Sequence, residues 1–231
     1  MRLHEAATAI GATLQGADRE FSAVSTDSRN LPPGCLFIAL RGERFDGHAF
    51  VEQVLAQGAA AVMVDDASRL PTPSPQSSAL IVDDTRLALG RLAAWQRHRM
   101  PAKLLAITGS NGKTTVKEMV AAIAGAHTGA DAVLATAGNF NNDIGMPLTL
   151  LRLAPSHQFA VIEMGMNHPG ELDYLSRLAQ PDVALVNNAL RAHLEGLGSV
   201  AAVARAKGEI YTGLKAEGIA LYNAAPEKPH F

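Results

Sequence analysis

The clearest chemistry in this sequence lies in a short glycine-rich stretch. It follows an apolar run at residues 104–108, precedes apolar residues at helical spacing, and consists of Gly109, Ser110, Asn111, Gly112, Lys113, Thr114 and Thr115. Between a strand and a helix, such glycines let backbone amides point at one anion, which the positive end of the helix dipole also attracts. Lys113 would reach the β- and γ-phosphates of ATP, and the Thr114 hydroxyl would ligate Mg²⁺. The stretch therefore predicts a nucleotide site; the alternative is a glycine turn that caps a helix and leaves Lys113 in solvent.

Three charged or titratable side chains further along are placed by the predicted elements. Glu163 ends a predicted strand and His193 lies in a loop after another, so both are expected at the sheet edge where open α/β sheets bind ligands. Lys207 lies in a segment with helical spacing. By residue type alone, Glu163 and His193 are also typical of exposed positions, and Lys207 is typical of a helix surface where it pairs with a glutamate.

Clusters of polar side chains could bind a substrate. A run of small hydroxyls, a carboxylate and a guanidinium suits recognition of a diphosphate and a ribose, but it is also typical of a polar turn. Its members are Ser25, Thr26, Asp27, Ser28 and Arg29. An aromatic face and a helix start follow at Phe45, Asp46 and His48. Asn139, Asn141 and Asn142, after a glycine, could bind substrate or cap the helix that begins near residue 143, and Asn139 and Asn142 are favoured for substrate.

The elements that must position these residues belong to an ordinary globular protein. The chain has 231 residues, of which 48% are hydrophobic and 18% charged, a composition too apolar for disorder. Its net charge of −2 lacks the basic excess that a nucleic-acid partner needs. No apolar run approaches the roughly 18 residues of a membrane span, and the N-terminus has no signal-like apolar core. The single cysteine, Cys35, cannot form an internal disulfide and is expected in the core of a cytoplasmic protein.

Hydrophobic periodicity predicts alternating strands and helices. In the first part, helices are predicted at residues 3–14, 47–57 and 84–99, the last with Asp84 as N-cap, and strands at 35–40, 59–64 and 79–82. After Pro101, strands are predicted at 104–108, 159–164 and 182–187 and helices at 170–178 and 199–214, which indicates a parallel sheet covered by helices. We expect an N-terminal unit at residues 1–83, a linker helix at 84–100 and a P-loop domain at 101–231.

Besides the phosphate loop, five separated motifs resemble one known family. They are Ser25-Thr26-Asp27-Ser28-Arg29, residues 37–42, Phe45-Asp46-Gly47-His48, residues 138–145 and residues 163–168. Together they resemble the Mur ligases, the ATP-dependent ligases that build the peptide stem of peptidoglycan. The resemblance runs from about the first residue to Leu221. It implies a small N-terminal α/β domain for a UDP-linked substrate, a mostly parallel P-loop ATPase-like α/β domain that is incomplete here, and a C-terminal domain that this chain lacks.

The resemblance also implies a reaction and its partners. ATP would phosphorylate the terminal carboxylate of UDP-N-acetylmuramoyl-tripeptide, and the amine of D-alanyl-D-alanine would attack the acyl phosphate. The protein would be a cytoplasmic monomer without nucleic-acid partners. Two alternatives stay open, namely a non-catalytic fragment that binds a nucleotide or a UDP-sugar, and a sibling Mur ligase that adds a different amino acid.

By the same resemblance, the catalytic residues would be Lys113, Glu163, His193 and Lys207. Two Mg²⁺ ions are expected, with Thr114, Glu163, His193 and Lys207 as ligands, and Lys207 would be carbamylated. An ordinary lysine is cationic at neutral pH, and about 4 Å from Mg²⁺ it would be repelled by roughly 8 kcal/mol. Reaction with CO₂ reverses that charge and supplies oxygen ligands. Residues 25–29 and 45–48, together with Asn139 and Asn142, would face the UDP-linked substrate.

Overall fold

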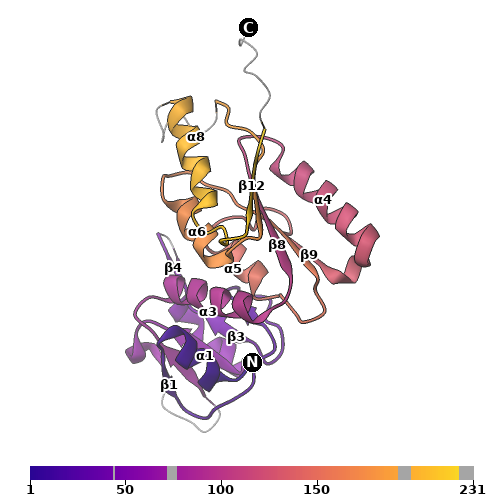
Figure 1. Cartoon of the computed structure of the whole chain (residues 1–231). Coiled ribbons are helices and arrows are strands. Elements are labelled where there is room, and N and C mark those ends of the chain that lie inside the picture. The colour runs from indigo at the N-terminus through magenta and orange to yellow at the C-terminus, as the bar shows by residue number, and fades with distance from the viewer. Residues whose placement is uncertain (44, 72–76, 192–198, 224–231) are drawn as a thin grey trace. The chain divides into compact units, whose positions relative to one another are not determined.

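The computed structural model describes residues 1–43, 45–71, 77–191 and 199–223. The chain folds into two compact units, Met1–Arg99 with Leu150–Arg152 and Met100–Thr149 with Leu153–Phe231. Each unit is built on its own five-stranded sheet with helices packed around it (Figure 1). Both units are α/β, which confirms the predicted fold class.

A mixed sheet forms the centre of the first unit. Its strand order is β1-β7-β6-β3-β2, and every neighbouring pair is parallel except β1 with β7. The strands are β1 (Thr13–Gln15), β2 (Val24–Ser25), β3 (Leu36–Ile38), β6 (Ala61–Val64) and β7 (Ala79–Ile81), and β4 (Arg41–Gly42) and β5 (Phe45–Asp46) form a separate antiparallel pair. The helices are α1 (Leu3–Ile10), α2 (Val51–Ala56) and α3 (Thr85–Arg99), with 3-10 turns η1 (Gly47–Phe50) and η2 (Ala67–Arg69).

Local sequence signals explain where two of these helices begin and end. Gly11 adopts a left-handed conformation with φ of 71° and ends α1, so the helix predicted at residues 3–14 was wrong beyond Ile10. The residues that follow form β1 instead. The side chain of Asp84 accepts hydrogen bonds from the backbone N–H groups of Arg86 and Leu87 at 2.7 and 2.9 Å, which confirms the predicted cap of α3. Cys35 is buried in the core of this unit, as expected.

The second unit contains an all-parallel sheet with the order β12-β11-β8-β10-β9. Its strands are β8 (Lys103–Thr108), β9 (Val133–Ala135), β10 (Phe159–Glu163), β11 (Val183–Val186) and β12 (Ile219–Tyr222). Its helical elements are α4 (Lys113–Thr128), η3 (Ala130–Ala132), α5 (Gly145–Leu150), α6 (Glu171–Ala179), α8 (Val200–Gly208) and η4 (Glu209–Tyr211). Figure 1 shows α4 on one face of this sheet and α6 and α8 on the other. The predicted parallel sheet is confirmed, but the helix predicted at 199–214 ends earlier and continues as η4.

Strand register in this sheet decides which loops meet. Glu163 at the end of β10 is level with Ile107 in β8, and Val186 at the end of β11 is level with Thr108. The loops that leave β8, β10 and β11 therefore emerge at one carboxyl edge, where open parallel sheets bind their ligands.

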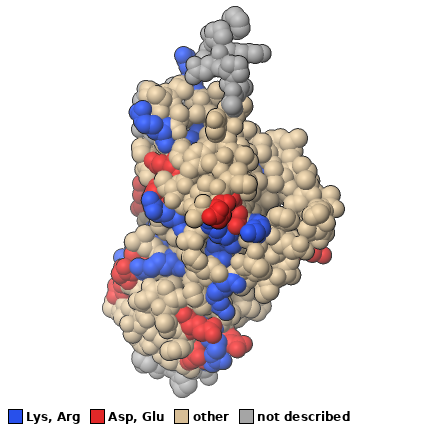
Figure 2. Space-filling view, viewed as in Figure 1, with Lys and Arg blue, Asp and Glu red and all other residues tan. Residues whose placement is uncertain are grey.

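The surface carries charges of both signs. On the face shown in Figure 2, Lys and Arg side chains are interspersed with Asp and Glu side chains. Exposed ion pairs of the protein include Arg2 with Asp18 and Arg177 with Asp173. None of the helices that the structure describes is long and apolar enough to cross a bilayer.

Candidate active site

The glycine-rich stretch forms the connection between β8 and α4, in the predicted strand, loop, helix arrangement. Gly112 precedes the first residue of α4 with φ of 74°, a left-handed conformation that favours glycine. A Cβ atom on Gly112 would also lie 3.1 Å from Nδ2 of Asn187. Lys113 begins the helix, and its Nζ donates a hydrogen bond to the carbonyl oxygen of Gly109 at 2.9 Å. The Lys113 side chain is therefore folded back onto the loop that precedes it, at the N-terminal end of α4.

Two asparagines that follow β11 hold the tip of this loop. Asn188 pairs with the backbone of Asn111 in both directions: its Oδ1 accepts the Asn111 N–H at 3.0 Å, and its Nδ2 donates to the Asn111 carbonyl at 3.0 Å. Nδ2 of Asn187 donates to the same carbonyl at 2.9 Å. These contacts were not predicted, although an Asn-Asn pair directly after a strand was the available signal. They fix the loop through a neighbouring strand of the sheet.

Glu163 meets the helix that follows the phosphate loop. Its Oε2 accepts a hydrogen bond from Oγ1 of Thr114 at 2.8 Å, and its Oε1 accepts one from Nδ2 of Asn141 at 2.7 Å. The carboxylate is nearly buried, and its backbone N–H donates to Oγ1 of Thr136 at 2.9 Å. Two residues expected from sequence to bind one ion are thus neighbours, although they are 49 positions apart.

The phosphate loop and Glu163 line one open pocket of ≈ 460 Å³. It is lined by Ser110, Asn111, Gly112, Lys113, Thr114, Thr115, Gly138, Asn139, Asn141 and Glu163. Every predicted phosphate-loop residue except Gly109 is therefore part of one cavity with Glu163. Amide groups, a lysine and hard oxygen donors are the chemistry that a nucleotide phosphate and its magnesium ion require.

The arrangement fits a magnesium ion better than an all-protein metal cage. Among the residues that the structure describes, no three His, Cys, Asp or Glu side chains are grouped to hold a metal. Mg²⁺, however, is usually held by one or two carboxylates and substrate phosphates and keeps several waters. Thr114 and Glu163 supply a hydroxyl and a carboxylate of that kind. The predicted ligand His193 lies outside the described residues.

Lys207 is a buried lysine near the phosphate loop. It lies in the last turn of α8 with 2% of its surface exposed. Burial, together with the nearby charge of Lys113, lowers the pKa of this amine from 10.5 to about 8. No hydrogen-bond or ion-pair partner of Lys207 occurs in the described part of the chain. A lysine in this state has a sizeable neutral fraction at slightly alkaline pH, which is the form that reacts with CO₂.

The three asparagines after Gly138 have different roles. Asn139 lines the pocket. Oδ1 of Asn142 accepts hydrogen bonds from the N–H groups of Gly145 at 2.8 Å and Ile144 at 3.3 Å, so this side chain caps α5, the alternative that the sequence left open. Asn141, which the sequence offered for the same roles but did not favour, is the one that donates to Glu163.

The polar run at residues 25–29 forms a tight turn in the first unit. Arg29 donates from Nε and Nη2 to the two carboxylate oxygens of Asp27, both at 2.9 Å. The Arg29 guanidinium lowers the pKa of Asp27 to about 2. Ser25 and Ser28 are buried, while the Arg29 side chain is 87% exposed. The turn therefore exposes the Asp27–Arg29 ion pair to solvent, while its two serine side chains are buried beneath that pair.

His48 is buried rather than open to a ligand. Its Nδ1 lies 2.7 Å from Oδ1 of Asp46 and its Nε2 lies 3.0 Å from Oδ1 of Asp65, and its side chain has no exposed surface. Arg41 also donates to Asp65, at 2.8 Å. Phe45, in contrast, is largely exposed and stacks on Phe50. His48 thus links Asp46 at the end of β5 to Asp65, which follows β6. The contact between His48 and Asp65 was not predicted.

Comparison with protein families matches most of the chain to two models. One described as "Mur ligase middle domain" matches residues 107–229, and one described as "Mur ligase family, catalytic domain" matches residues 20–97. The second model covers the turn at residues 25–29 and the β4–β5 pair, and the first covers the phosphate loop from Thr108 onward.

Two similar curated proteins carry the same name. The chain is 54% identical over 215 residues to the UDP-N-acetylmuramoyl-tripeptide–D-alanyl-D-alanine ligase of Escherichia coli (strain K12), which covers 93% of this chain and 46% of that protein. It is 46% identical over 199 residues to the ligase of the same name from Bacillus subtilis (strain 168), which covers 86% of this chain and 42% of that protein. The chain therefore spans about half the length of the curated relatives it matches.

Solved structures agree with this relationship. A crystal structure of MurF from Acinetobacter baumannii superposes with a TM-score of 0.86 at 41% identity, over 95% of this chain and 48% of that one. MurF ligase from Thermotoga maritima in complex with ADP superposes with a TM-score of 0.77 at 30% identity, over 87% of this chain and 45% of that one.

Proposed function

The chain belongs to the Mur ligase family, and from that premise we propose that it supplies the UDP-substrate-binding and ATP-binding parts of an amide ligase of peptidoglycan synthesis. The ligase would join D-alanyl-D-alanine to UDP-N-acetylmuramoyl-tripeptide in the cytoplasm, as a monomer. ATP would transfer its γ-phosphoryl group to the tripeptide carboxylate and leave as ADP. The dipeptide amine would then attack the acyl carbon, lose a proton and expel inorganic phosphate. The names of the curated relatives support this choice of substrates.

The observation that carries the proposal is the meeting of Thr114 and Glu163 at the phosphate loop. Bringing a carboxylate to a triphosphate sets one anion against another, so catalysis depends on charge neutralisation and alignment. The loop amides and Lys113 would hold the β- and γ-phosphates. Lys113 would exchange its present bond to the Gly109 carbonyl for phosphate oxygens. Thr114 and Glu163 would hold Mg²⁺, which neutralises phosphate charge when bound.

A second Mg²⁺ and a carbamate on Lys207 form the finer part of the proposal. With a pKa of about 8, roughly a quarter of the amine is neutral at pH 7.5. Addition of CO₂ to the amine nitrogen, with loss of one proton, replaces a buried cation with an anion. The positive charge of Lys113 disfavours the protonated form of the Lys207 amine. With a carbamate on Lys207, the same charge would instead attract the negative group. The carbamate and His193 would supply ligands for the second ion.

The UDP-linked substrate would bind to the first unit. The exposed Asp27–Arg29 pair and the exposed ring of Phe45 are the groups of that unit suited to a diphosphate and a base. Ser25, Thr26 and Ser28 would shape the turn beneath them, and His48 would hold Asp46 in place. In the second unit, Asn139 would bind substrate from the wall of the phosphate pocket, and Asn142 would shape the start of α5.

A second candidate function is binding of nucleotide and UDP substrate without turnover. It is supported by the pocket at the phosphate loop, which contains the groups that a nucleotide phosphate requires. Calorimetric titration of the purified chain with Mg·ADP and with UDP-N-acetylmuramoyl-tripeptide would measure binding, and ADP release in the presence of D-alanyl-D-alanine would measure ligation.

Each outcome of these assays has a distinct meaning. ADP release that requires both substrates supports the ligase, and binding without release supports the binding function. If neither ligand binds the unsubstituted chain, both functions are wrong. Adding the C-terminal half of the Escherichia coli relative as a separate polypeptide would show whether turnover needs that half.

A further inference from the structure

One fully buried lysine has no part in the reaction proposed above. Lys117 lies on α4, one turn after Thr114, with 2% of its surface exposed. Removing an ammonium group from water is costly unless it is hydrogen-bonded. Nζ of Lys117 donates to the carbonyl oxygen of Thr136 at 2.7 Å, across the face of the sheet. It also lies 2.6 Å from Oε1 of Glu118.

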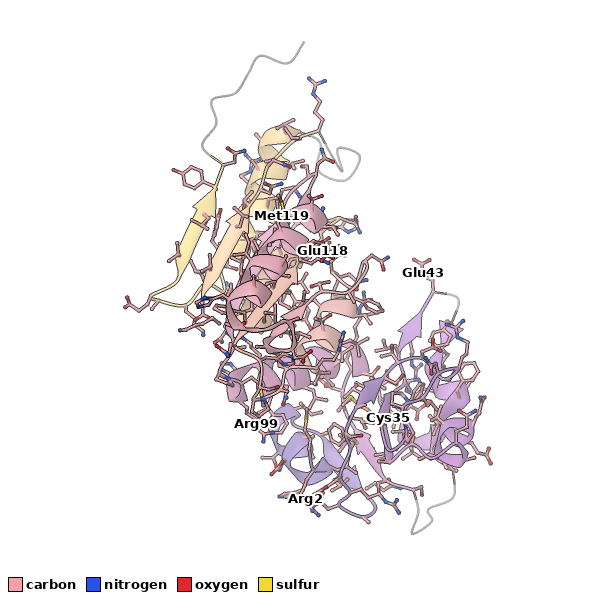
Figure 3. The ribbon with its side chains drawn as sticks, turned by 90° about the vertical axis from the view of Figure 1, so that its right-hand side faces the viewer. Arg2, Cys35, Glu43, Arg99, Glu118 and Met119 are labelled. Carbon is pink, nitrogen blue, oxygen red and sulfur yellow. The ribbon has the colours of Figure 1, made fainter. Side chains whose placement is uncertain are left out.

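The contact with Glu118 does not account for the burial of Lys117. The Glu118 side chain is 66% exposed, and it lies with Met119 on the outward side of α4 (Figure 3). Ion pairs that reach solvent contribute little. The carbonyl of Thr136 is the buried partner, since Thr136 is 1% exposed.

Thr136 connects three elements of the second unit. It follows β9, and its N–H donates to the carbonyl of Val161 in β10 at 3.1 Å. Its Oγ1 accepts a hydrogen bond from the backbone N–H of Glu163 at 2.9 Å, and its carbonyl oxygen accepts one from Nζ of Lys117. The position of the Glu163 backbone therefore depends on a residue that Lys117 holds.

The hydrogen bonds close a circuit on α4. From Lys117 they run through Thr136 to the backbone of Glu163, and the Glu163 carboxylate returns to the helix at Thr114. Both ends of the circuit are on the first turn and a half of one rigid helix. An apolar residue in place of Lys117 could fill the space but would leave the Thr136 carbonyl without this donor.

We propose that Lys117 is a positioning residue which, through Thr136, fixes Glu163 and so sets the affinity of the nucleotide site for magnesium. The inference deepens the proposed function and rests on it. Groups that orient a metal ligand without touching the metal typically change metal affinity by about 10- to 100-fold. Lys117 itself is not among the residues that line the nucleotide pocket.

The test uses the full chain and two variants that open the circuit at different points. Lys117→Met removes the donor to the Thr136 carbonyl, and Thr136→Val removes the acceptor for the Glu163 N–H. Thr136→Ser keeps the hydroxyl, and Glu118→Gln keeps the Lys117–Thr136 bond, so both serve as matched controls. Three quantities are measured: ADP affinity in EDTA, Mg²⁺ affinity of the ADP complex, and exchange of the Glu163 amide hydrogen without ligands.

We expect Lys117→Met and Thr136→Val to lower Mg²⁺ affinity by about tenfold or more and to leave ADP affinity in EDTA within about twofold. The Glu163 amide should exchange about tenfold faster in both variants, and the two controls should match the unsubstituted chain. If Lys117→Met lowers only the melting temperature, or lowers both affinities equally, Lys117 has a structural role alone and the proposal is wrong.

Failure of the proposed function gives a different result. In that case the unsubstituted chain does not bind ADP at all. The exchange measurement needs no ligand, so it still decides the positioning step. Unchanged exchange of the Glu163 amide in Lys117→Met overturns the inference whatever the chain binds.

Discussion

Replacing the buried Lys207 by methionine should make the chain more stable at neutral pH. Its pKa falls from 10.5 to about 8 because burial penalises the charged amine. The folded chain thus binds this proton less tightly than the unfolded chain, and protonation favours unfolding. The difference between 10.5 and about 8 corresponds to a cost of about 3 kcal/mol below pH 8. Stability should therefore rise as the pH increases from about 8 to 10.5.

Lys207→Met removes that cost and that pH dependence. We expect a gain of up to about 3 kcal/mol in the free energy of unfolding at pH 7 in buffer free of CO₂. Little of that gain should remain near pH 10.5. Urea unfolding followed by far-ultraviolet circular dichroism at a series of pH values measures both. Lys103→Met is the matched control, because the side chain of Lys103 is 72% exposed.

Bicarbonate adds a second arm to the same experiment. If Lys207 becomes a carbamate, added bicarbonate should stabilise the unsubstituted chain at pH 7.5 and leave Lys207→Met unchanged. A variant that is no more stable than its parent at pH 7, with the same pH dependence, would refute the view that the charged form of Lys207 is destabilised by burial.

Other variants test the phosphate loop and the turn of the first unit. Lys113→Ala should weaken Mg·ADP binding at least about tenfold in calorimetry with the urea midpoint unchanged; full affinity would remove Lys113 from the site. Asn188→Ala deletes two hydrogen bonds to the loop, each worth about 1 kcal/mol, so ADP affinity should fall about thirtyfold. The loss of ADP affinity should be smaller in Asn188→Asp, because aspartate keeps the oxygen that accepts the Asn111 N–H. An equal loss in both variants would contradict that account. Arg29→Ala should weaken binding of UDP-N-acetylmuramoyl-tripeptide and leave ADP binding unchanged; the reverse pattern would contradict the assignment of Arg29 to the UDP substrate. In the same variant the carboxyl of Asp27, now held near 2, should titrate closer to its ordinary value, as carboxyl NMR would show.

The sheet of the second unit could be predicted from sequence because its strands are short, continuous apolar runs. A strand buried on both faces, such as β10, leaves that pattern regardless of what packs on it. The phosphate loop could be predicted for a similar reason, since glycines, lysine and threonine must be consecutive to surround a phosphate.

Contacts between distant segments could not be predicted in the same way. Asn141 and Asn142 are adjacent in sequence and chemically identical, yet one binds Glu163 and the other caps α5. The choice depends on the path of the chain between β9 and α5. His48 was predicted to face the substrate, and the sequence could not show that its side chain is buried between Asp46 and Asp65, which is 17 positions away. The end of α1 was misjudged because apolar spacing continued into β1, whereas the left-handed Gly11 ended the helix.

The 2.8 Å between Oγ1 of Thr114 and Oε2 of Glu163 has a consequence for how an ion would enter. The hydroxyl and the carboxylate oxygen are therefore side by side before any ion is bound. Together they would offer Mg²⁺ the hard oxygen ligands that it prefers, and little side-chain rearrangement would be required.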